Sequence, residues 1–228
     1  MTKVLLVGSP QRTEELKKRA WKNCLFVDFI QTTLEELALQ AADVDVVIDL
    51  NLDEQPLRIN AYKDLDIPVI VSSLRVQLAE MVALAEGEMN CQLIGMNCLP
   101  SFIDRNVIEL SLYHSANKTD LEALMTGFGQ DFQLVEDRVG MVTPRILFMI
   151  MNEACYTLQE GTANIEDIDL GMKLGTNFPF GPFEWANRIG IDEVYLTLDA
   201  IYEDTRDERY KICPLLKTMY LKEEIFTY

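Results

Sequence analysis

The sequence has few of the residues that build metal sites and disulfide frameworks. It contains one histidine and five cysteines, and no two cysteines form a CxxC pair. A Cys/His zinc site needs about four such ligands at short spacings, so no metal site of this class is expected. An odd cysteine count without pairing motifs favours reduced thiols, and we therefore expect a cytoplasmic protein.

Long apolar runs and excess basic charge are also missing. The apolar run near the N-terminus is too short for a signal peptide, and no stretch approaches the ~18 apolar residues of a membrane span. The chain has 20 Lys and Arg against 37 Asp and Glu, a net charge of −17. Such an acidic surface repels phosphate backbones and anionic lipids, so neither nucleic acid nor membrane is an expected partner.

The composition is that of a folded globular chain. Of its 228 residues, 49% are hydrophobic and 25% are charged, which is typical of one large domain or two small ones. Up to about residue 138, short runs rich in Val, Ile and Leu alternate with helical patterns. This alternation predicts an α/β domain of parallel βα units, with a mixed α+β sheet as the alternative. We expect strands at 4–7, 25–28, 44–50, 69–72, 92–96, 107–112 and 132–135, and helices at 14–22, 33–42, 76–86 and 120–127.

From about residue 139 the apolar spacing becomes helical. Thr143 and Pro144 are expected to be the N-cap and first residue of a long helix that ends at Gly161. Asn164 is expected to cap the next helix and Gly175 to end it. No run with a strand period follows, so residues 139–228 are predicted to form an all-α domain. Its remaining helices are expected to begin at Gly181-Pro182, Asp192 and Cys213-Pro214.

The turn after the first predicted strand is the first candidate site. A dinucleotide-binding fold has G-x-G-x-x-G here, so that the backbone can approach a pyrophosphate. This chain keeps Gly8, but Pro10 and Thr13 replace the other two glycines, and proline has no N–H to donate. Asp28, 20 residues after Gly8, stands where a ribose-binding carboxylate is expected. We interpret this as a shortened Rossmann-like domain whose pyrophosphate turn has degenerated. The six basic residues within the first 22 are either a solvated helix face or an anion site beside this turn.

More specific motifs lie in the second half. They include Asn152-Glu153-Ala154, Met172-Lys173-Leu174-Gly175 and Phe180-Gly181-Pro182-Phe183-Glu184, and together they resemble the C-terminal domain of the 3-hydroxyacyl-CoA dehydrogenase family. The resemblance continues to about Tyr210. It implies a Rossmann-type NAD domain followed by a helical domain that forms a homodimer, here through residues 139–228. It also implies fatty acid metabolism, with oxidation of 3-hydroxyacyl-CoA to the 3-ketoacyl thioester and NAD as the cofactor.

The resemblance can be followed into the first half. Residues 45–49 (D-V-V-I-D) are similar to the family's D-x-V-x-E strand, which places Asp49 at its buried carboxylate. Residues 71–74 (V-S-S-L) are similar to N-T-S-S-L, which places Ser72 at a substrate-contacting serine. The implied cofactor-binding positions are therefore Gly8, Pro10, Asp28 and Asp49.

The implied catalytic positions show a substitution. Residues 95–100 (G-M-N-C-L-P) resemble the family's G-x-H-F-F-N-P, and Asn97 occupies the position of the catalytic histidine. The partner glutamate is present as Glu109, and a substrate-contacting asparagine of the family falls on Pro144. The sole histidine, His114, does not match the family position and is expected at the surface. Cys98 is expected to be buried and inert.

These departures leave three hypotheses. Because asparagine cannot titrate, loss of the general base is expected to cost ~10²–10⁴ in rate. A long helical pair of the family also cannot fit between Asp28 and Asp43. The first hypothesis is a catalytically impaired relative that binds an acyl or nucleotide-like ligand. The second is an active oxidoreductase with rebuilt cofactor contacts, and the third is a non-catalytic dimeric interaction protein.

Overall fold

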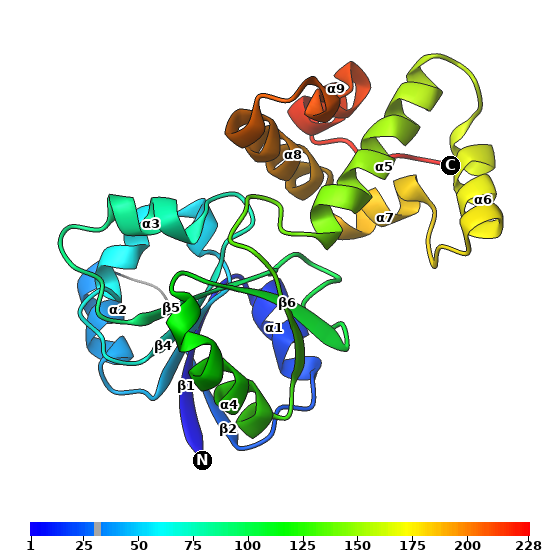
Figure 1. Cartoon of the computed structure of the whole chain (residues 1–228). Helices are drawn as coiled ribbons and strands as arrows, with labels where there is room; N and C mark the ends of the chain where they lie inside the picture. The colour runs from blue at the N-terminus through cyan, green and yellow to red at the C-terminus, as the bar shows by residue number, and fades with distance from the viewer. Residues whose placement is uncertain (30–32) are drawn as a thin grey trace. The chain divides into compact units, whose positions relative to one another are not determined.

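The computed structural model describes residues 1–29 and 33–228 and contains two compact units (Figure 1). The first, Met1–Met141, holds a seven-stranded sheet with helices on both faces, and the second, Val142–Tyr228, is helical. The predicted order of an α/β Rossmann-like domain followed by an all-α domain is confirmed.

The sheet of the first unit has the strand order β2-β1-β3-β4-β5-β6-β7. The strands β1 to β5 run parallel to one another, β6 pairs antiparallel with β5, and β7 pairs parallel with β6. All seven predicted strands are confirmed, with ends shifted by at most two residues. They are β1 (Thr2–Val7), β2 (Cys24–Asp28), β3 (Val46–Asp49), β4 (Pro68–Ser72), β5 (Gln92–Met96), β6 (Val107–Leu112) and β7 (Asp131–Leu134).

The expectation of parallel units fails between β5 and β6. The connection, residues 97–106, forms turns and holds no helix. A parallel neighbour needs a crossover of about a dozen residues or more, so this short connection reverses the chain direction. The reversal brings the residue after β5 opposite β6.

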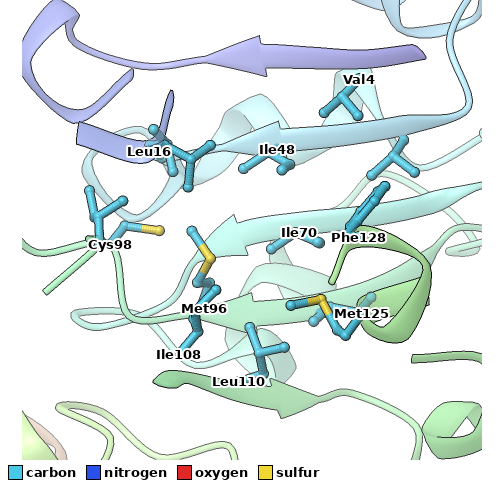
Figure 2. Packing of buried hydrophobic residues seen from close by; sticks show 14 of the residues in the cluster. Val4, Leu16, Ile48, Ile70, Met96, Cys98, Ile108, Leu110, Met125 and Phe128 are labelled. Carbon is cyan, nitrogen blue, oxygen red and sulfur yellow. The ribbon is translucent and has the colours of Figure 1, made fainter. Parts of the chain in front are cut away.

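Two apolar layers cover the sheet. Helices α1 (Pro10–Lys18) and α4 (Lys118–Phe128) cover one face, where Figure 2 shows Leu16 and Phe128 packed near Val4, Ile48 and Ile70. The opposite face is covered by the helices α2 (Leu34–Ala41) and α3 (Leu78–Leu84) and by the 3-10 helices η1 (Leu52–Glu54) and η2 (Pro56–Ala61). A further 3-10 turn, η3 (Ser115–Asn117), precedes α4. Both faces of the inner strands are therefore buried.

Helix α1 begins four residues earlier than predicted. Ser9 is its N-cap, with the Oγ accepting from the N–H of Arg12 at 3.4 Å, and Pro10 occupies the first turn. Serine is a favoured N-cap and proline is tolerated directly after it, so the polar turn itself starts the helix. Consequently the N-terminus of α1 lies in the turn where the candidate pyrophosphate site was expected.

The second unit contains the helices α5 (Thr143–Gln159), α6 (Ile165–Thr176), α7 (Pro182–Ile189), α8 (Ile191–Thr205) and α9 (Pro214–Lys222), with a 3-10 turn η4 (Glu208–Tyr210). The capping of α6 by Asn164, which accepts from the Asp167 N–H at 2.8 Å, is confirmed. The predicted end at Gly175 is wrong, because Asn177 supplies the left-handed residue, with φ 57°. Thr143 is the first helical residue rather than the N-cap, and α8 starts one residue before Asp192.

A buried aspartate explains one of the most specific motifs. Asp169 of α6 accepts hydrogen bonds from the N–H groups of Phe183 (2.9 Å) and Glu184 (3.0 Å), so it caps α7 from a neighbouring helix. Gly181 leaves the room for this contact, since a Cβ there would lie 2.1 Å from Asp169 Cγ. Gly181 is therefore required by packing.

Gly181→Ala is expected to lower the free energy of unfolding by about 1–3 kcal/mol, because the added methyl displaces the capping carboxylate. Urea denaturation followed by circular dichroism measures the change. The matched control is Gly175→Ala in α6, where an added Cβ meets nothing within 4 Å. It is expected to stabilise the helix by roughly 0.5–1 kcal/mol. Equal effects of the two substitutions would contradict this account.

Candidate functional site

The strand order defines where a ligand is expected in the first unit. Strand β1 lies between β2 and β3. The connection from β1 to β2 therefore runs to one side of β1, and the connection from β2 to β3 returns to the other side. In open parallel sheets, ligands bind outside the carboxyl ends of the strands at this topological switch point. The crevice is therefore expected between the turn after β1, which begins at Gly8, and the turn after β3, which begins at Leu50.

The side chain of Asn51 fills this turn. Its Oδ1 accepts a hydrogen bond from the Ser9 N–H at 2.8 Å. A Cβ at Gly8 would lie 3.0 Å from Leu50 Cβ and 3.1 Å from Asn51 Oδ1, so glycine is needed for this close approach. Pro10 follows at the start of α1 without an N–H. The Ser9 N–H and the space beside Gly8 are thus taken by the chain itself.

Arg12 and Glu54 complete this arrangement. The guanidinium of Arg12 is buried, with Nη1 donating to the Leu50 carbonyl at 2.6 Å and Nη2 lying 3.1 Å from Glu54 Oε1. Asn51 Nδ2 donates to the same Glu54 oxygen at 2.6 Å. Neither Asn51 nor Glu54 was among the residues predicted from the sequence. The only signal was that proline and threonine replace glycines in the turn, which indicates an altered turn but not which side chain fills it.

The two carboxylates predicted to bind the cofactor have partners within the chain. Asp28, at the end of β2, receives Lys17 Nζ at 2.5 and 2.6 Å. Asp49 is fully buried and accepts from Arg58 Nη1 at 3.0 and 3.1 Å, from the Tyr62 hydroxyl at 2.9 Å and from the Asn51 N–H at 3.0 Å. Burial raises the pKa of Asp49, while Arg58 and these hydrogen bonds act in the opposite direction. Asp49 therefore holds η2 on β3, and its carboxylate faces protein groups.

Asn97 and Glu109 are brought together, as the family resemblance implied. The antiparallel register of β5 and β6, with Met96 opposite Leu110, places them side by side. Asn97 Nδ2 lies 3.4 Å from Glu109 Oε2, and Asn97 Oδ1 accepts from the Leu99 N–H at 3.3 Å. The amide is 4% exposed. An amide held in this way can donate a hydrogen bond, but it cannot accept a proton at neutral pH.

Ser72 ends β4 and pairs with Met96, the residue before Asn97. Ser72 is fully buried next to the thiol of Cys98, whose pKa is raised by burial. The expectation of a buried Cys98 is confirmed. Pro144 is buried in α5 of the second unit. His114 is exposed, as expected, and its ring lies 4.3 Å from that of Tyr113.

Two searches of the described residues were negative. Among residues 1–29 and 33–228, no group of three or more His, Cys, Asp or Glu side chains could hold a metal ion. No helix in the same residues is both long and apolar enough to cross a membrane.

Sequence comparisons give a consistent result. Residues 140–226 match the family described as 3-hydroxyacyl-CoA dehydrogenase, C-terminal domain. A 3-hydroxybutyryl-CoA dehydrogenase of Bradyrhizobium diazoefficiens is 28% identical over 211 residues, covering 90% of this chain and 69% of that protein. A probable 3-hydroxybutyryl-CoA dehydrogenase of Bacillus subtilis is 30% identical over 197 residues, covering 82% of this chain and 67% of that protein.

Solved structures show the same fold. An (S)-3-hydroxybutyryl-CoA dehydrogenase from Ralstonia eutropha superposes with a TM-score of 0.74 at 21% identity, and the match covers 100% of both chains. FadB2 from M. tuberculosis gives a TM-score of 0.76 at 19% identity, covering 100% of this chain and 99% of that one.

Proposed function

Because the chain belongs to the 3-hydroxyacyl-CoA dehydrogenase family, we propose that it is a catalytically impaired member that binds an acyl thioester without oxidising or reducing it at the usual rate. The observation that carries this proposal is the amide of Asn97, held 3.4 Å from Glu109. The resemblance of residues 95–100 to the family's G-x-H-F-F-N-P motif implies that Asn97 takes the position of the catalytic histidine. The expected ligand class is a 3-hydroxyacyl or 3-oxoacyl thioester.

The chemistry of an amide supports binding without turnover. A general base has to accept the proton of the substrate hydroxyl, and its pKa has to lie near the working pH. Asn97 has no such pKa. Its Oδ1 is bound to the Leu99 N–H and one Nδ2 hydrogen is directed to Glu109, which leaves one N–H to donate to an acyl oxygen. Asn97 is therefore expected to orient a ligand oxygen without moving a proton.

The residues at the switch point argue against ordinary binding of NAD, the cofactor of the family. The Ser9 N–H is bound by Asn51, Pro10 has no N–H, and Asp28 is paired with Lys17. These groups do not fit a pyrophosphate and ribose as they stand. An active oxidoreductase with rebuilt contacts would have to bind the cofactor through other donors, so this alternative is the weaker one.

The test compares turnover with binding. Reduction of acetoacetyl-CoA by NADH is expected to be at least about a hundredfold slower than with the Bacillus subtilis relative assayed in parallel. Acetoacetyl-CoA alone is expected to give saturable binding in calorimetry. A rate within about tenfold of that relative would refute impairment. Absence of acetoacetyl-CoA binding would overturn the proposed ligand and favour an interaction protein.

We further propose that the chain forms a homodimer through the helical unit and is located in the cytoplasm. Leu170 and Leu174 lie one turn apart on α6 and are 53% and 79% exposed, and Ile146 on α5 is 61% exposed. Side chains of this kind are typical of a buried interface. The five free thiols fit a reducing compartment. Light scattering tests the dimer, and a particle with the mass of one chain would contradict it.

A further inference from the structure

We propose that Asn51 and Glu54 close an anion site at the β1–β3 switch point, with the Glu54 carboxylate lying where a ligand phosphate would otherwise bind. This inference rests on the proposed function, because a closed site explains why the cofactor of the family would not bind. It adds the residues responsible and the ligand class that they exclude, a phosphate or pyrophosphate group.

Arg12 carries a buried guanidinium. Arg12 lies in the first turn of α1, where the helix terminus already favours negative charge. Its side chain is only 5% exposed, and a buried cation needs a counter-charge. Glu54 supplies that charge at 3.1 Å, and its own side chain is 36% exposed. The buried Arg12 guanidinium therefore requires a neighbouring anion, and the Glu54 carboxylate is that anion.

The side chain of Asn51 makes two of the hydrogen bonds that close the site. Its Oδ1 takes the Ser9 N–H at 2.8 Å, and its Nδ2 holds Glu54 Oε1 at 2.6 Å. Backbone N–H groups at a helix N-terminus and an arginine fork are the donors that bind phosphates in proteins. Asn51 thus occupies the Ser9 N–H, and it also fixes the Glu54 carboxylate that occupies the Arg12 guanidinium.

The short helix η1 holds Glu54 in place. Asp53, the preceding residue, is buried, and its Oδ2 accepts from the N–H groups of Leu74 (3.1 Å) and Arg75 (3.3 Å) in the loop after β4. This fixes η1 to the loop after β4, at the carboxyl edge of the sheet. Glu54 is therefore positioned by the fold rather than by a surface contact alone.

The experiment removes the closure and measures binding of inorganic pyrophosphate to the full chain by calorimetry. The double variant Asn51→Ala with Glu54→Ala is expected to bind pyrophosphate at least about tenfold more tightly than the wild type. Adding Arg12→Met to this variant is expected to abolish the gain. Glu54→Gln, which keeps a hydrogen-bond partner for Asn51 but removes the charge, is expected to give a smaller gain.

The matched control is Glu35→Ala, which changes the net charge equally at an exposed position of α2. No gain in the double variant, or an equal gain in the control, would overturn the inference. Pyrophosphate binding does not depend on turnover. Ordinary wild-type turnover would therefore overturn the proposed function, whereas an inactive wild type with no gain on opening would overturn only this inference.

Discussion

Replacing Arg58 with methionine is expected to lower the free energy of unfolding by about 3–5 kcal/mol, because it leaves the Asp49 carboxylate buried without its cation. Asp49 is fully buried, and Arg58 Nη1 contacts both of its oxygens at 3.0 and 3.1 Å. Tyr62 and the Asn51 N–H remain as neutral donors that cannot cancel a full charge. Urea denaturation measures the loss.

The pH dependence of this loss has a defined sign. Burial already raises the pKa of Asp49, and removing Arg58 takes away the main opposing effect, so the pKa rises further in the variant. In Arg58→Met, the full loss of unfolding free energy is expected above the pKa that Asp49 has in the folded variant. The loss disappears as the pH falls toward the pKa of this aspartate in the unfolded chain. Arg58→Met is therefore expected to cost much less at acidic pH than at neutral pH.

Two controls separate a lost ion pair from lost packing. Lys17→Met removes the cation of the exposed pair with Asp28, in which the side chains are 35% and 53% exposed. It is expected to cost less than about 1 kcal/mol. The double variant Asp49→Leu with Arg58→Met removes both charges and is expected to recover most of the stability. A loss that is the same at all pH values, or that persists in the double variant, would show that Arg58 acts through packing.

Most of the fold could be predicted from the sequence, because the apolar runs and the helix caps of the sequence agree with the structure. The strands β1, β3, β4 and β5 are runs of mostly buried, mostly apolar residues, and the caps at Asn164 and Gly181 are residue types that start helices. The misplaced end of α6 has a physical reason. Gly175 is a plausible stop, but asparagine also adopts the left-handed conformation, and Asn177 does so two residues later.

The site was only partly predictable. The contact between Asn97 and Glu109 follows from the family spacing together with the antiparallel β5–β6 pair. The hydrogen-bond partners of the predicted carboxylates could not be predicted, since no local pattern indicates that Asp49 pairs with Arg58 nine residues later. Asn51 belongs to no motif in the sequence. Its role depends on the parallel pairing of β1 with β3, a contact between distant segments.

Restoring the histidine is expected to have a large effect only when the switch point is opened as well. Asn97→His alone is expected to raise the rate of acetoacetyl-CoA reduction by NADH by less than about tenfold. The variant Asn51→Ala with Glu54→Ala, which still lacks a proton donor, is expected to gain equally little. The combination of all three substitutions is expected to gain at least about a thousandfold over the wild type, which exceeds the product of the separate gains. The excess over the product of the separate gains measures the coupling between the two defects.

The pH profile identifies the imidazole in the combined variant. Glu109, which lies 3.4 Å from the Asn97 amide, is positioned to hold the ring and to raise its pKa. Because reduction needs the protonated ring to give its proton to the ketone oxygen, the rate should fall as the pH rises through that pKa. Asn97→Gln in the opened background keeps an amide and should show neither the gain nor the titration. Full activity from Asn97→His alone would mean that the closed turn is no barrier to the cofactor.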